Sequence, residues 1–263
     1  MAPIGYWGNP TSTLDWCEEN YEVTRYIAEF WNTISNLALL IPPIYGGWIS
    51  WKHGLEFRYV LCYVFLFIVG VGSWCFHMTL LYEMQLLDEL PMVWGTLMMI
   101  YSLYEVHSPP DKINKLLALE LLIYGIIVSV VYLAIRQPIF HQLAYGFLVV
   151  IVVGFDIRLA LTGKCEIWIF VVASISYSTA FCMWNIDNVF CSELITARQL
   201  LPFVFRPLTQ LHGWWHCLAG YGTYLQILYF CQARMIHRKE PCKIKVIWPF
   251  LFPYLGPKKQ TIQ

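Results

Sequence analysis

Residues 58–92 read RYVLCYVFLFIVGVGSWCFHMTLLYEMQLLDELPM and decide the fold. From 58 to 77 the stretch is almost entirely apolar and is long enough to cross a bilayer as one helix. Ser73 and His77 stand near its end, spaced i and i+4, so they share one helix face. Asp88 stands at the entrance to the next apolar run, where a short loop folds it back beside His77. Ionisable groups inside a membrane span are costly and mark functional sites, so the stretch predicts both a membrane helix and a site.

Further apolar runs of similar length fill most of the chain. The predicted spans cover 30–50, 58–77, 88–105, 116–134, 139–157, 166–184 and 209–231. Short connections favour antiparallel, tightly bundled neighbours, and no linker or repeat divides the chain. The pattern predicts an all-α integral membrane protein, a bundle of seven transmembrane helices. In this reading 1–29 is an N-terminal segment, 30–231 is the bundle and 232–263 is a basic tail.

The composition agrees with burial in lipid. The chain is 58% hydrophobic and 13% charged, whereas a soluble domain carries about 25% charged residues. The formal net charge is zero, which argues against nucleic acid as a partner. No feature of the sequence indicates an obligate protein partner, so we expect lipid to be the main contact.

The basic residues predict the orientation of the bundle. Most of the 17 Lys and Arg fall on the side that holds the C-terminus and the loops after the first, third and fifth spans. The opposite side holds Arg25, Arg136, Arg198 and Arg206. Because positive charge stays in the cytosol, we expect a lumenal N-terminus and a cytosolic C-terminus.

Two more histidines resemble metal ligands. His212 and His216 are spaced i and i+4, so both reach one metal ion from one helix face, and His77 completes a set of three. Three protein ligands leave a fourth position for water, as in catalytic zinc sites. The alternative is that each histidine is a hydrogen-bonding anchor at the membrane interface, which is how we interpret His53, His107, His141 and His237. A histidine pair inside a span favours the metal.

An acidic segment precedes the first span. Asp15, Glu18, Glu19, Glu22 and Glu29 repel one another unless a cation lies among them, and oxygen ligands of this kind suit calcium. The spacing is not that of an EF-hand loop. The residues alone favour the alternative, an exposed acidic segment that caps the first helix.

Two other groups of residues fall on the predicted lumenal side. Asn185, Asp187 and Asn188 end the sixth span and are candidates to support the metal ligands. Cys17 and Cys191 lie in lumenal segments, where an oxidising compartment permits a disulfide between them.

Several longer motifs carry a resemblance to a known family. They are TSTLDWCEENY (11–21), YIAEFWNTISN (26–36), GSWCFHMTLLYEMQLLDELPM (72–92), PIFHQ (138–142), MWNIDNVFC (183–191) and HGWWHCLAGYGTY (212–224). Together they resemble the alkaline ceramidases, in particular the type 3 or phytoceramidase branch. The resemblance implies a seven-helix hydrolase of endoplasmic reticulum and Golgi membranes, similar in plan to the adiponectin receptors. It implies hydrolysis of ceramides, dihydroceramides and phytoceramides to a sphingoid base and a fatty acid.

The resemblance also implies roles for individual residues. Zinc would be held by His77, His212 and His216, with Ser73 and Asp88 as the catalytic pair. A calcium site would comprise Asp15, the backbone carbonyl of Trp16, Glu18, Asn20 and Glu29, which reverses the interpretation of the acidic segment based on composition. Gly213 replaces the alanine more usual in HGWWH, which leaves the chemistry intact.

These residues suggest a mechanism. A zinc-bound water would attack the amide, Asp88 would take its proton, and Ser73 would donate a hydrogen bond to the oxyanion. In a less favoured alternative Ser73 is an acyl-accepting nucleophile, but it lacks a free histidine as base. The rival function is a seven-helix lipid-sensing receptor with structural zinc.

Overall fold

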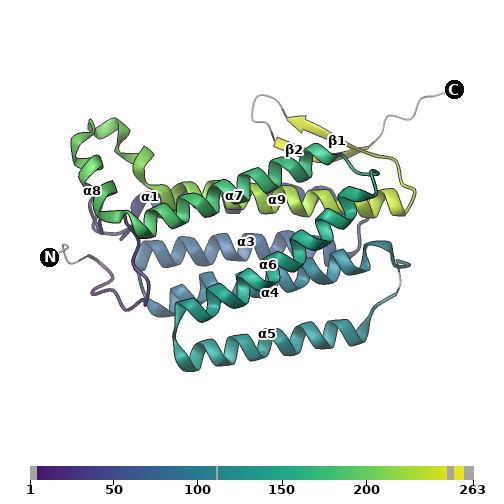
Figure 1. Cartoon of the computed structure of the whole chain (residues 1–263), viewed down its shortest axis with the longest axis horizontal. Helices are drawn as coiled ribbons and strands as arrows, with labels where there is room; N and C mark the ends of the chain where they lie inside the picture. Colours follow the sequence, from purple (N-terminus) through teal and green to yellow (C-terminus); the bar gives the residue numbers. More distant parts are fainter. Residues whose placement is uncertain (1–4, 111, 248–251, 258–263) are drawn as a thin grey trace.

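The computed structural model describes residues 5–110, 112–247 and 252–257, and these are mostly helical (Figure 1). The helices are α1 (Phe30–Ser35), α2 (Leu37–Lys52), α3 (Phe57–Thr79), α4 (Tyr82–Tyr104), α5 (Lys115–Ile135), α6 (Pro138–Leu161), α7 (Ile167–Val189), α8 (Cys191–Leu200) and α9 (Leu211–His237). Two short 3-10 helices, η1 (Glu105–His107) and η2 (Phe203–Thr209), follow α4 and α8. The long helices α3, α4, α5, α6, α7 and α9 run along one long axis, with α5 at an outer edge (Figure 1).

Four of the described helices are long and apolar enough to span a membrane. They are α3, α5, α6 and α7. Helix α2 has 16 residues, which is short for a span, whereas α4 and α9 are long but carry polar groups such as Asp88, Glu89 and His212. The membrane character of the chain follows from these four helices, and a count of seven spans stays a prediction.

Close approach of α3 and α4 brings two candidate catalytic residues together. A Cβ atom at Gly72 would lie 1.9 Å from the backbone oxygen of Leu87, so only a glycine permits this spacing. The neighbours of these two positions in the chain are Ser73 and Asp88. Glycine at position 72 therefore allows α3 and α4 to approach closely enough to bring Ser73 and Asp88 together.

Two helix boundaries differ from the sequence prediction. Helix α4 begins at Tyr82 rather than 88, so Asp88 lies in its second turn and not at its entrance. The α3–α4 connection is a tight turn with Leu80 in the left-handed region (φ 51°), and the Tyr82 backbone NH donates to Thr11 Oγ1 at 3.0 Å. The first predicted span, 30–50, is divided at Asn36 into α1 and α2.

The all-α prediction is incomplete because the predicted tail contains a hairpin. Strands β1 (Cys242–Ile247) and β2 (Phe252–Pro257) pair antiparallel, and α9 continues to His237, beyond the expected end of the bundle at 231. The hairpin packs on α9 and α2, where Tyr224 donates to Pro253 O at 2.8 Å and His53 Nε2 lies 3.0 Å from Leu255 O. Residues 258–263 of that tail lie outside the described residues.

The described part of the N-terminal segment is held at the opposite end of the long axis from the hairpin (Figure 1). The predicted disulfide is present in the structure: Cys17 is joined to Cys191 at the start of α8. Arg198 of α8 donates to Cys17 O at 3.0 Å and pairs with the Glu19 carboxylate. These contacts tie the segment to a helix that lies far from it in sequence.

Candidate metal centre

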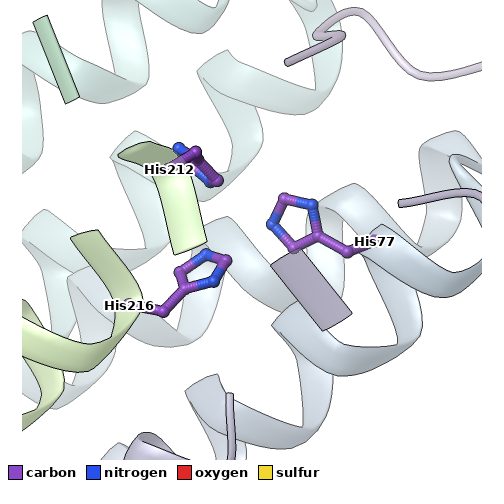
Figure 2. A group of neighbouring side chains, drawn as sticks. All are labelled: His77, His212 and His216. Carbon is purple, nitrogen blue, oxygen red and sulfur yellow. The ribbon is translucent and has the colours of Figure 1, made fainter. Parts of the chain in front are cut away.

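Three histidines from two helices converge (Figure 2). His77 lies near the end of α3, and His212 and His216 lie in the first two turns of α9. One ring nitrogen of each comes within 4.8 Å of the other two, and all three side chains are buried. The sequence prediction that these residues lie together is therefore met by the geometry.

The hydrogen bonds of His77 and His216 leave one nitrogen of each directed toward the cluster. His77 Nδ1 lies 2.5 Å from Glu29 Oε2, whereas its Nε2 has no partner among the described residues. His216 Nδ1 lies 3.1 Å from Asn32 O and 2.8 Å from Ser35 Oγ. A carbonyl only accepts, so Nδ1 carries the hydrogen and Nε2 keeps its lone pair.

His212 completes the set. Its Nδ1 is buried without a hydrogen-bond partner in the described part of the chain, and its ring stacks on Trp16 at 3.7 Å and 17°. Unpartnered buried nitrogens are rare in folded proteins. Imidazole nitrogens of this kind are zinc ligands, and a carboxylate or carbonyl on the far nitrogen is the usual support. The residues present therefore fit a zinc ion.

Of the three polar residues predicted to support the ligands, only Asp187 reaches them. It accepts from the His212 backbone NH at 3.3 Å and from the Cys17 backbone NH at 3.2 Å. Asn185 and Asn188 instead donate to carbonyls of their own helix. The sequence did not predict the supporting contacts of Asn32, Ser35 and Glu29. They depend on how α1 is rotated against α3 and α9, and the residue pattern of α1 does not encode that rotation.

Ser73 and Asp88 lie beside the histidines. Ser73 Oγ is 3.4 Å from His216 Nε2, and Asp88 lies close enough to Ser73 to interact with its hydroxyl. Both residues line a cavity of about 610 Å³ together with His212 and His216. The rest of its wall is mainly apolar and includes Phe65, Leu66, Val69, Val149 and Val153. The arrangement places a hydroxyl, a carboxyl and two imidazoles in the wall of an apolar pocket, with His77 beside the other two histidines.

The five residues predicted to bind calcium also gather in one place. Glu18 accepts from the backbone NH groups of Trp31 and Asn32 at 2.7 and 2.8 Å, and so caps α1. Glu29 Oε1 accepts from the Trp16 backbone NH at 3.2 Å. Asn20 donates to Asp15 at 3.4 Å, and its own Oδ1 is buried without a partner among the described residues.

The electrostatics of this acidic cluster, Asp15, Glu18, Asn20 and Glu29, favour a cation. Burial raises the pKa of Glu18 to about 8, and the charge of Glu29 adds to the rise. Burial also raises the pKa of Glu29 to about 8, with a further contribution from Asp15. A divalent cation would offset this repulsion, and carboxylate and amide oxygens are the ligands that calcium prefers. The donor set fits calcium.

Comparison with known proteins gives one consistent family. A family model described as ceramidase matches residues 8–256. The chain is 44% identical over 263 residues to alkaline ceramidase 3 of Mus musculus, covering 95% of this chain and 96% of the relative. It is 34% identical to an alkaline ceramidase of Saccharomyces cerevisiae (98% and 89% covered) and 30% identical to an alkaline ceramidase of Arabidopsis thaliana (98% and 97% covered).

Proposed function

The chain belongs to the alkaline ceramidase family and is a ceramidase, and from this premise we propose that it is a zinc-dependent, calcium-stimulated intramembrane amidase. Its substrates would be ceramides, including dihydroceramides and phytoceramides, which it would cleave to a sphingoid base and a free fatty acid. The observation that carries the proposal is the convergence of His77, His212 and His216, two of which line an apolar pocket together with Ser73 and Asp88.

The side chains of the site have separate roles in amide hydrolysis. Zinc bound by the three imidazoles would supply a Lewis acid and a water of lowered pKa. Asp88 accepts the proton of the attacking water and passes it to the departing amine nitrogen. Ser73 donates a hydrogen bond to the oxygen that becomes negative. Glu29 and Asn32 fix the rings of His77 and His216 by accepting from their far nitrogens.

Calcium would act through position rather than chemistry. We assign it to Asp15, the Trp16 carbonyl, Glu18, Asn20 and Glu29, whose oxygens gather beside α1. Trp16 stacks on His212, and Glu29 contacts His77. A cation that orders the acidic cluster would therefore also order two of the three zinc ligands.

The proposal includes seven membrane spans, with α2, α4 and α9 added to the four apolar helices. The N-terminus would be lumenal and the C-terminus cytosolic, in endoplasmic reticulum and Golgi membranes. Two features support this orientation: the basic residues gather on the other side, and the Cys17–Cys191 disulfide needs an oxidising compartment.

Metal content measured beside ceramide turnover tests the zinc assignment. Purified wild-type protein should contain zinc, lose fatty acid release on chelation, and recover it on addition of zinc. His212→Ala should lose zinc and activity together, whereas His53→Ala, far from the cluster, should lose neither. A His212→Ala protein that is zinc-loaded and active would refute the ligand assignment. A zinc-loaded wild type without turnover would instead favour a lipid-sensing receptor.

A further inference from the structure

The apolar pocket continues away from the metal centre into a second cavity with a polar end. This cavity measures about 160 Å³ and lies between α4, α6, α7 and α9. It shares Thr96, Tyr145, Tyr177 and Thr223 with the wall of the larger pocket, so the two adjoin. Asp156, Gln226 and Tyr229 line only the second cavity, and we call these three residues the polar floor.

Two buried atoms of the polar floor have no hydrogen-bond partner among the described residues. Asp156 is 1% exposed; its Oδ2 accepts from Gln226 Nε2 at 2.5 Å, whereas its Oδ1 has no hydrogen-bond partner in the described part of the chain. The hydroxyl of Tyr229, also 1% exposed, is equally unpartnered there. Burying such groups against apolar surface is costly, and polar cavities of this size hold ordered water. None of the three residues contributes to the chemistry proposed above.

The distance from the metal centre matches a lipid chain. His216 and Gln226 lie on the same helix, ten residues apart, which corresponds to about 15 Å along its axis. An extended chain advances about 1.25 Å along its axis for each carbon–carbon bond of about 1.5 Å. About twelve methylene groups therefore cover that distance. A longer chain that entered the pocket would bring its terminal methyl group against Asp156 and Tyr229.

We propose that the polar floor limits the length of the lipid chain that this pocket accepts. A methyl end that reaches the floor displaces the water that satisfies Asp156 and Tyr229 and offers no hydrogen bond in return. Shorter chains end before the floor and leave its hydration intact. The proposal deepens the proposed function, on which it rests for the identity of the substrate, and it makes Asp156 a specificity-determining residue.

Asp156→Leu in the full-length protein provides the test. The substrates are ceramides that differ in N-acyl length at a fixed base, and a second series that differs in the base at a fixed acyl chain. In wild type we expect kcat/KM to fall about tenfold once the chain in the pocket reaches the floor. In Asp156→Leu the ratio of long-chain to short-chain kcat/KM should rise about tenfold, because the floor has become apolar. The series that responds identifies the chain that occupies the pocket.

Matched controls separate polarity from shape. Asp156→Asn keeps a polar floor and should retain the wild-type length profile, whereas Tyr229→Phe removes one hydroxyl and should shift it in the direction of Asp156→Leu by a smaller factor. A long chain that ends in a hydroxyl group should be accepted by wild type and rejected by Asp156→Leu. If Asp156→Leu does not fold, Tyr229→Phe and the hydroxyl-ended chain carry the test alone.

Thermal stabilisation by the same lipids measures binding without turnover. If the wild-type protein hydrolyses no ceramide, the proposed function is wrong. The dependence of thermal stabilisation on lipid chain length still tests the polar floor in that case. Identical length profiles in wild type and folded Asp156→Leu, in both lipid series, would overturn the inference.

Discussion

Oxygen Oε2 of Glu29 lies 2.5 Å from Nδ1 of His77, and Oε1 of the same carboxyl accepts from the Trp16 backbone NH at 3.2 Å. One side chain thus contacts both the histidine cluster and the acidic cluster. It fixes the tautomer of His77 and leaves Nε2 for a metal. Any change at Glu29 should therefore alter both sites.

Glu29→Gln should weaken zinc binding by about 10- to 100-fold, because a carboxylate that accepts from a ligand histidine raises the basicity of that ligand. Competition with a chromogenic zinc chelator measures the affinity. Glu22→Gln is the matched control, since Glu22 is an exposed acid of the same segment that pairs only with Arg206 among the described residues. Equal zinc affinity in wild type and Glu29→Gln would show that the contact is incidental.

Asp15→Asn should separate calcium from zinc. Asp15 belongs to the acidic cluster but has no contact with a histidine in the structure, so the variant should keep its zinc and lose most of the rise in activity with added calcium. Turnover is compared in a calcium-selective chelator and in saturating calcium at constant ionic strength. If wild type itself is indifferent to calcium, the acidic cluster is only a helix cap.

Asp88→Asn should remain folded and zinc-loaded but lower kcat by about two orders of magnitude or more, because an amide cannot accept the proton of the attacking water. Glu83→Gln, an exposed acid in the first turn of the same helix, controls for loss of charge on α4. Wild-type turnover in Asp88→Asn would remove this residue from the mechanism.

Ser73→Ala distinguishes the two roles of the hydroxyl. If Ser73 is an oxyanion donor, Ser73→Ala should lower kcat by about 10²- to 10³-fold and leave KM little changed. As a nucleophile, it should be essential and should carry an acyl group in the wild type during turnover. Mass spectrometry of acid-quenched wild type decides between them: a fatty acyl adduct on Ser73 would contradict the oxyanion role.

Cys191→Ser should destabilise the protein by about 2–4 kcal/mol, the typical effect of removing a disulfide. Thermal unfolding with and without reductant measures it, and reductant should shift only the wild type. Cys182→Ser, an exposed free cysteine on α7, is the control. Recovery of both Cys17 and Cys191 as alkylable thiols under non-reducing conditions would rule out the bond.

Sequence patterns predicted the helices that carry the three histidines and the meeting of those histidines, but not the contacts that support them. The i, i+4 spacing placed His212 and His216 on one face because that relation is local. Ser35, the partner of His216, lies in the short helix α1, and Glu29, the partner of His77, is the cap of that helix. Both contacts depend on how α1 packs against α3 and α9. No periodicity in one segment encodes the rotation of another.

Hydropathy also marks where a segment is apolar rather than where its helix begins. Helix α4 starts at Tyr82 because a tight turn and Thr11 define its first turn, and residues 82–87 include polar groups that lower the local hydropathy. For the same reason, the hydropathy pattern did not predict α8, the hairpin or the polar floor. The floor joins Asp156 and Gln226 of different helices, and each residue alone reads as an isolated polar interruption of an apolar run.

The disulfide imposes an order on biogenesis. Cys17 leaves the ribosome long before Cys191, and helices α1 to α7 are synthesised between them. The thiol of Cys17 must stay available until the whole of α7 and Cys191 have been synthesised. Closure of the bond in newly made chains therefore shows that synthesis has passed α7 and reached Cys191.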